Sequence, residues 1–90
     1  MSKITNHVLS FTVIYEEALE GGYIAFVPSL PGCHTQGESI EETEKNIKES
    51  IELYLESLES HDETIPKEKR ILQGKVEVNY PFALWNKFQL

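Results

Sequence analysis

The chain has few of the residues that form disulfides, span a membrane or direct secretion. It has one cysteine in 90 residues, Cys33, so no disulfide can form within it, which fits a reducing compartment. No apolar run approaches the roughly 18 residues that a membrane-spanning helix needs. Residues 1–5 lack both the basic start and the apolar stretch of a secretion signal. We therefore predict a cytoplasmic protein that does not associate with a membrane.

Residues that could carry chemistry are also scarce. The three histidines and one cysteine match no familiar spacing of zinc ligands. Cys33 and His34 are neighbours on a predicted strand, where adjacent side chains point to opposite faces, so they cannot pair as nucleophile and base. We predict no catalytic residues, no metal site and no cofactor. A hydrolase that uses His34 or the carboxylates is the least favoured of three hypotheses.

Charge is distributed unevenly along the chain. The net charge is −7, and residues 38–63 hold ten acidic residues against two lysines, which gives −8. Residues 1–37 carry −2 and residues 64–90 carry +3. An acidic surface repels phosphate backbones and attracts basic proteins. This favours a basic protein partner over direct nucleic-acid binding, although acidic residues can also serve solubility alone.

Four segments have the composition and period of two that are typical of strands. They are residues 7–16, 23–27, 33–36 and 75–80. The first two suggest an antiparallel hairpin, with apolar side chains on both of their faces. In the last, Val76, Val78 and Tyr80 alternate with polar residues. Residues 60–73 are polar, contain Pro66 and predict a connecting loop.

A helix is predicted from Ser39 onward. Ser39 is the expected N-cap, and Glu42 lies three residues later to complete a capping box. Apolar or small residues recur along one helical face, and acidic residues dominate the opposite face. The apolar face comprises Ile40, Thr43, Ile47, Ile51, Tyr54, Leu55 and Leu58.

The element order β-β-β-α-β predicts one α+β domain over residues 1–90, with a core of about residues 7–80. One helix can cover only one face of an antiparallel sheet, so a second copy of the chain would most simply cover the other. Residues 81–90 form an apolar tail, expected either to fold back on the sheet or to dock on a neighbouring subunit. Its apolar side chains are Phe82, Leu84, Trp85, Phe88 and Leu90.

A motif in the middle of the chain resembles the HicB antitoxin family of HicA–HicB toxin–antitoxin systems. A strand ends in a P-x-x-P-G turn and is followed by T-x-G-x-S-x-E-E at the start of the helix. The resemblance covers roughly residues 8–80, with Thr43 and Ser50 where alanine is usual. The matching positions are Pro28, Pro31, Gly32, Thr35, Gly37, Ser39, Glu41, Glu42 and Asn46. Most of them are expected to be scaffold; Asn46 could bond a backbone edge or simply be exposed.

The resemblance implies a partial ribonuclease H fold without the catalytic carboxylates of a nuclease. It also implies neutralisation, by direct binding, of a small basic HicA-type messenger ribonuclease whose catalytic histidine is covered or displaced. Many relatives carry a C-terminal DNA-binding module. Only ten residues follow Tyr80 here, so we expect no separate DNA-binding domain.

Two binding hypotheses follow from these observations. The first is an antitoxin-like domain that acts as a homodimer or higher homo-oligomer and binds its toxin through the acidic helix face and the turn. Its candidate contact residues are Glu41, Glu49, Glu52, Glu56, Pro31 and His34. The alternative is a stand-alone oligomeric adaptor or ligand-binding domain without a toxin.

Overall fold

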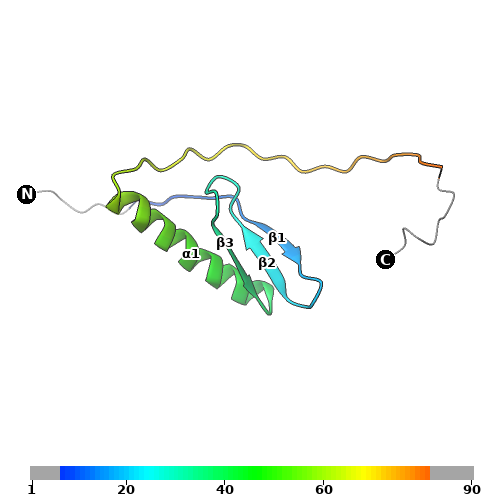
Figure 1. Cartoon of the computed structure of the whole chain (residues 1–90), viewed down its shortest axis with the longest axis horizontal. Coiled ribbons are helices and arrows are strands. Elements are labelled where there is room, and N and C mark those ends of the chain that lie inside the picture. Colours follow the sequence, from blue (N-terminus) through cyan, green and yellow to red (C-terminus); the bar gives the residue numbers. More distant parts are fainter. Residues whose placement is uncertain (1–6, 82–90) are drawn as a thin grey trace, which may run out of the picture.

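The structure is a computed structural model that describes residues 7–81. It consists of a three-stranded antiparallel sheet followed by one long helix that packs against it, as the sequence predicted up to the end of the helix (Figure 1). The strand order is β1-β2-β3. The elements are β1 (Ile14–Glu17), β2 (Tyr23–Phe26), β3 (His34–Gly37) and α1 (Ile40–Ser60).

The strand register divides the side chains of the sheet between two faces. Tyr15 pairs with Ala25, and Ala25 pairs with Thr35. Ala25 is fully buried and belongs to the same core cluster as Ile47 of α1, so this row faces the helix. The neighbouring rows face away from it, since successive side chains of a strand alternate. These rows are Ile14–Phe26–His34 and Glu16–Ile24–Gln36.

The start of α1 follows the predicted capping box. Ser39 is the N-cap, and its hydroxyl accepts a hydrogen bond from the backbone N–H of Glu42 at 3.1 Å. The Glu42 carboxylate reaches back to the N–H of Glu38 at 3.3 Å, one residue before the cap. Thr43 is completely buried, and its hydroxyl donates to the Ser39 carbonyl at 2.7 Å. The first turn is therefore held by the side chains that the sequence supplies for it.

The hydrophobic core is small and lies where the sheet, the turn and the helix meet. Its buried residues are Ala25, Val27, Leu30, Cys33 and Ile47. The partly buried residues packed against it are Phe11, Val13, Tyr15, Ile51 and Tyr54. Leu53, which is not among the residues of the predicted apolar helix face, is 65% exposed.

The turn between β2 and β3 is folded inward around Leu30. The Leu30 N–H donates to the Val27 carbonyl at 3.0 Å, and the Cys33 N–H donates to the Leu30 carbonyl at 2.9 Å. Gly32 has a φ of +84°, a left-handed conformation that favours glycine. These two successive turns bring the Leu30 side chain into the core with no exposed area.

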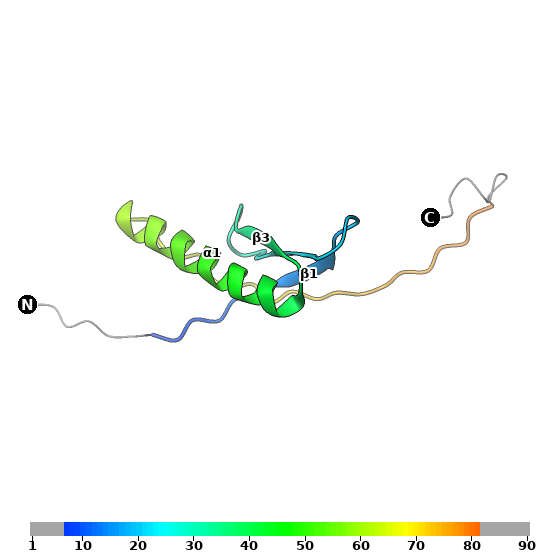
Figure 2. The same cartoon turned by 90° about the horizontal axis from the view of Figure 1, so that it is seen from below.

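Two strand predictions are wrong in part or in full. The predicted first strand began at residue 7, but the observed one begins at Ile14, because residues 7–13 have no neighbouring strand among the described residues with which to form a ladder. The predicted fourth strand at residues 75–80 is absent. That segment is extended and runs beyond the end of the sheet, so it does not join the sheet formed by β1, β2 and β3 (Figures 1 and 2). The apolar tail predicted at residues 81–90 lies, apart from Pro81, outside the described residues.

Candidate protein-binding surfaces

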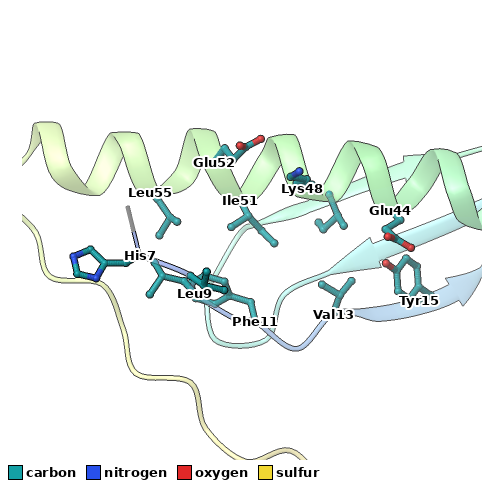
Figure 3. A pocket seen from close by; sticks show the side chains of 12 residues that line it. His7, Leu9, Phe11, Val13, Tyr15, Glu44, Lys48, Ile51, Glu52 and Leu55 are labelled. Carbon is teal, nitrogen blue, oxygen red and sulfur yellow. The ribbon is translucent and has the colours of Figure 1, made fainter. Parts of the chain in front are cut away.

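An open apolar groove of about 850 Å³ runs between α1 and the stretch that leads into β1 (Figure 3). The groove exists because α1 lies over β2 and β3 and not over β1. Its floor and walls are mainly apolar side chains from these two elements. They are Val8, Leu9, Phe11, Val13, Tyr15, Ile47, Ile51 and Leu55.

Charged side chains border the groove on the helix side. Glu44, Lys48 and Glu52 line it along successive turns of α1, and Tyr15 lies opposite Glu44 (Figure 3). Burial raises the pKa of Tyr15, and the negative charge of Glu44 raises it further. Tyr15 is therefore a neutral phenol at neutral pH, and its ring can serve as an apolar wall.

Within residues 7–81, no helix covers the opposite face of the sheet. Ile14 and Phe26 are only half-buried there, and Ile24 is 39% exposed. The sequence predicted apolar residues on both faces of the first two strands. The structure confirms this for the described residues. Exposed apolar groups of this kind are common at protein interfaces.

The predicted contact residues do not form one surface. The four glutamates predicted on the outer side of α1 are all exposed, and Glu52 also borders the groove. His34 is exposed on the face of the sheet that points away from α1. Pro31 is exposed at the tip of the β2–β3 turn. A single flat partner could therefore not contact the acidic helix face and His34 together.

The residues of the motif from Pro28 to Asn46 make contacts that join β3 to α1. The Asn46 side-chain amide donates to the Gln36 carbonyl at 2.8 Å. Of the two alternatives for Asn46, a hydrogen bond to a backbone edge or a simply exposed side chain, the structure shows the hydrogen bond. This bond ties α1 to β3. Gly37 is placed so close to α1 that a β-carbon would lie 2.6 Å from the Thr43 hydroxyl oxygen. The motif thus holds β3 against the first turns of the helix.

The described residues contain no group of three or more side chains that could hold a metal ion. Cys33 is buried and His34 is exposed, so these neighbours do point apart. Burial raises the pKa of the Cys33 thiol, which makes it a poor nucleophile. Within residues 7–81, no helix is both long and apolar enough to cross a membrane.

One polar contact was not anticipated from the sequence. Glu68, in the stretch that follows α1, accepts hydrogen bonds from the backbone N–H of Thr12 and from the Ser29 hydroxyl, the latter at 2.6 Å. These bonds lower the pKa of its carboxyl group, first through Ser29 and then through Thr12. The contact holds the chain after α1 against both the approach to β1 and the β2–β3 turn. Nothing in the pattern around Glu68 distinguishes it from other surface glutamates.

We expect this contact to depend on pH in a defined direction. The folded-state pKa of Glu68 is lowered, so above the ordinary pKa of glutamate the carboxylate is ionised and accepts its hydrogen bonds in full. These hydrogen bonds are lost as the pH falls through the lower folded-state pKa. Hydrogen exchange at the Thr12 amide, corrected for the intrinsic rate, should therefore accelerate on acidification.

Glu68→Ala should accelerate the same exchange already at neutral pH, several-fold relative to the wild type. Glu77→Ala is the matched control, since it also removes one carboxylate from an exposed position on the same stretch. It should leave the exchange rate of the Thr12 amide unchanged. Equal protection of Thr12 in both variants would show that Glu68 does not hold this segment.

The chain is similar to one protein-family profile and to several known proteins. A sequence profile described as a HicB-like antitoxin of bacterial toxin–antitoxin systems matches residues 11–89. A UPF0150 protein of Synechocystis is 45% identical over 73 residues, covering 81% of this chain and 92% of its own length. A UPF0150 protein of Thermoplasma acidophilum is 47% identical over 60 residues, covering 67% of this chain and 87% of its own.

A third relative, a UPF0150 protein of Helicobacter pylori, is 46% identical over 61 residues, covering 68% of this chain and 85% of its own length. The profile spans the groove residues from Phe11 onward, the β2–β3 turn, α1 and the extended stretch after it. This agrees with the resemblance found in the motif from Pro28 to Asn46. The chain belongs to the HicB-like antitoxin family.

Proposed function

We propose that this protein is an antitoxin that binds and neutralises a small basic HicA-type messenger ribonuclease in the cytoplasm, without catalytic activity of its own. Family membership supplies the class of partner. The observation that carries the proposal is the outer side of α1, where Glu41, Glu49, Glu52 and Glu56 are exposed together. Residues 38–63 carry a net charge of −8.

The physical advantage of such a surface lies first in the rate of association. Complementary charge steers a basic protein toward an acidic one and can raise the association rate by 10- to 1,000-fold at low salt. The same field repels messenger RNA, so the protein would compete for the toxin without binding its substrate. The hydrogen bond from Asn46 to β3 and the close approach of Gly37 to Thr43 hold the acidic helix against the sheet before a partner binds, which lowers the ordering cost of binding.

The direct test is to co-express this chain with the small basic protein encoded beside it. We expect the two proteins to co-purify, and we expect the messenger cleavage by the basic protein to stop when this chain is added in equal amount. Cleavage that continues unchanged in the presence of this chain at saturating concentration would contradict the proposal.

A charge-reversal pair tests the docking surface separately. Glu49→Lys with Glu52→Lys should lower the association rate with the basic partner by about tenfold at low salt, because two attractive charges become repulsive. Glu17→Lys with Glu20→Lys makes the same change in net charge at exposed positions outside α1 and should have a much smaller effect. Equal losses for both pairs would mean that net charge matters and the helix face does not.

The second candidate is an oligomeric adaptor or ligand-binding domain that has no toxin partner. The open apolar groove beside α1 is the observation in its favour. Its signature would be a stable oligomer that does not bind the neighbouring basic protein in the co-purification described above.

A further inference from the structure

The helix α1 is much longer than the strands that it covers. Its 21 residues span about 32 Å at 1.5 Å per residue, whereas each strand has four residues and spans about 13 Å. The buried residues of α1, Thr43 and Ile47, both lie in its first half. The C-terminal half extends past the strands (Figures 1 and 2). The sheet therefore leaves the outer side of this half open to a partner.

The negative charge around α1 is concentrated in this C-terminal half. Residues 49–63 contain six acidic residues and no lysine or arginine, which gives a net charge of −6. Residues 38–48 contain four acidic residues and two lysines, which gives −2. A basic protein would therefore be attracted most strongly to the C-terminal half of the helix.

The acidic residues of this half also oppose the dipole of the helix. The C-terminal end of a helix carries a partial negative charge, so cations stabilise it and anions destabilise it. The last turn of α1 has no basic residue, and Glu59 lies in it. Glu52 and Glu56 are four positions apart, where like charges repel each other. The free protein thus loses stability through charges that a basic partner would neutralise.

An exposed apolar side chain lies within this acidic surface. Leu53 is 65% exposed, more than any other large apolar side chain of α1. Its neighbours three and four positions away on the helix surface are all polar. They are Glu49, Ser50, Glu56 and Ser57. Single exposed leucines are common, but an apolar centre inside a polar rim is the usual arrangement of a protein interface.

We propose that the basic toxin docks on the C-terminal half of α1, with Leu53 as the apolar anchor of the interface. Glu49 and Glu56 pair with lysine or arginine side chains that flank an apolar residue of the toxin. This inference rests on the proposed function and assigns it to one part of the helix. A second copy of the chain does not fit this surface, because a charge of −6 would then face another of −6.

The first test truncates the anchor. Leu53→Ala should weaken binding of the small basic protein encoded beside this chain by about tenfold, because the complex then buries less apolar area. The loss should appear mainly as faster dissociation in surface plasmon resonance. Leu19→Ala is the matched control, since Leu19 is fully exposed between Glu17 and Glu20 but lies outside α1. It should leave binding unchanged.

The second test compares the two halves of the helix by charge. Glu56→Gln with Glu59→Gln removes two charges from the C-terminal half, and Glu41→Gln with Glu44→Gln removes two from the first half. At low salt the C-terminal pair should slow association several-fold more than the other pair. In the free protein the C-terminal pair should raise the melting temperature and the other pair should lower it, because negative charge is unfavourable only at the C-terminal end.

The results distinguish the docking site from the proposed function. If the wild-type chain binds the basic protein and Leu53→Ala binds it equally tightly, or if both charge pairs slow association equally, the docking site is wrong and the antitoxin function stands. A wild-type chain that does not bind the basic protein would overturn both. Leu53→Ala alone should match the wild type in sedimentation velocity. A changed oligomeric state would mean that Leu53 contacts a second copy, which would also overturn the proposal.

Discussion

Replacing Ile47 with alanine should lower the free energy of unfolding by about 2–5 kcal/mol. Ile47 is 2% exposed and is the one helical residue in the buried hydrophobic cluster. Its removal leaves a cavity where α1 meets Ala25 of the sheet, and a core this small has few other contacts to compensate. Domains of this size are often stable by only about 5 kcal/mol, so the substitution should remove a large fraction of the total stability.

Leu53→Ala is the matched control for Ile47→Ala. Both substitutions shorten a branched aliphatic side chain in the middle of the same helix, but Leu53 is 65% exposed. Its change should be within about 0.5 kcal/mol. Both free energies should be measured by urea unfolding at one protein concentration, since any self-association would shift them. Equal losses at the two positions would show that α1 does not pack on the sheet through Ile47.

Replacing Gly37 with alanine should cost about 1–3 kcal/mol through overpacking. An added methyl group would lie 2.6 Å from the Thr43 hydroxyl oxygen and 2.8 Å from its backbone nitrogen. Thr43 is fully buried and is held by its bond to the Ser39 carbonyl, so it cannot move aside without disturbing the helix cap. The loss should also weaken the junction between β3 and α1.

Gly74→Ala provides the comparison for Gly37→Ala. A β-carbon at Gly74 meets no other atom within 4 Å. The substitution should be neutral or slightly stabilising, because alanine restricts the unfolded chain more than glycine does. Thermal unfolding of the two variants in parallel will show whether close packing sets the requirement for glycine. A Gly37→Ala protein as stable as the wild type would refute the tight contact.

The acidic outer side of α1 is the surface proposed for the toxin, and Glu52 on that side also borders the apolar groove. Charge reversal at Glu49 and Glu52 should therefore be accompanied by a check that the oligomeric state is unchanged.

The sequence alone determined those features that depend on neighbouring residues. Helix capping by Ser39 and Glu42 acts over three residues, and the apolar stripe of α1 repeats within each turn. The first two strands alternate over a few positions, and their hairpin needs only a short loop. The motif around Gly32 and Asn46 also identified the family, because its spacing follows from the contacts between one turn, one strand and one helix.

Only the tertiary structure decided where strands stop and which surfaces stay open. Residues 75–80 alternate as a strand does, yet strand formation needs a neighbouring backbone, and this segment runs beyond the end of the sheet (Figures 1 and 2). The groove likewise depends on α1 lying over β2 and β3 and leaving β1 uncovered. Backbone pairing and helix placement join residues far apart in the chain, so no local pattern specifies them.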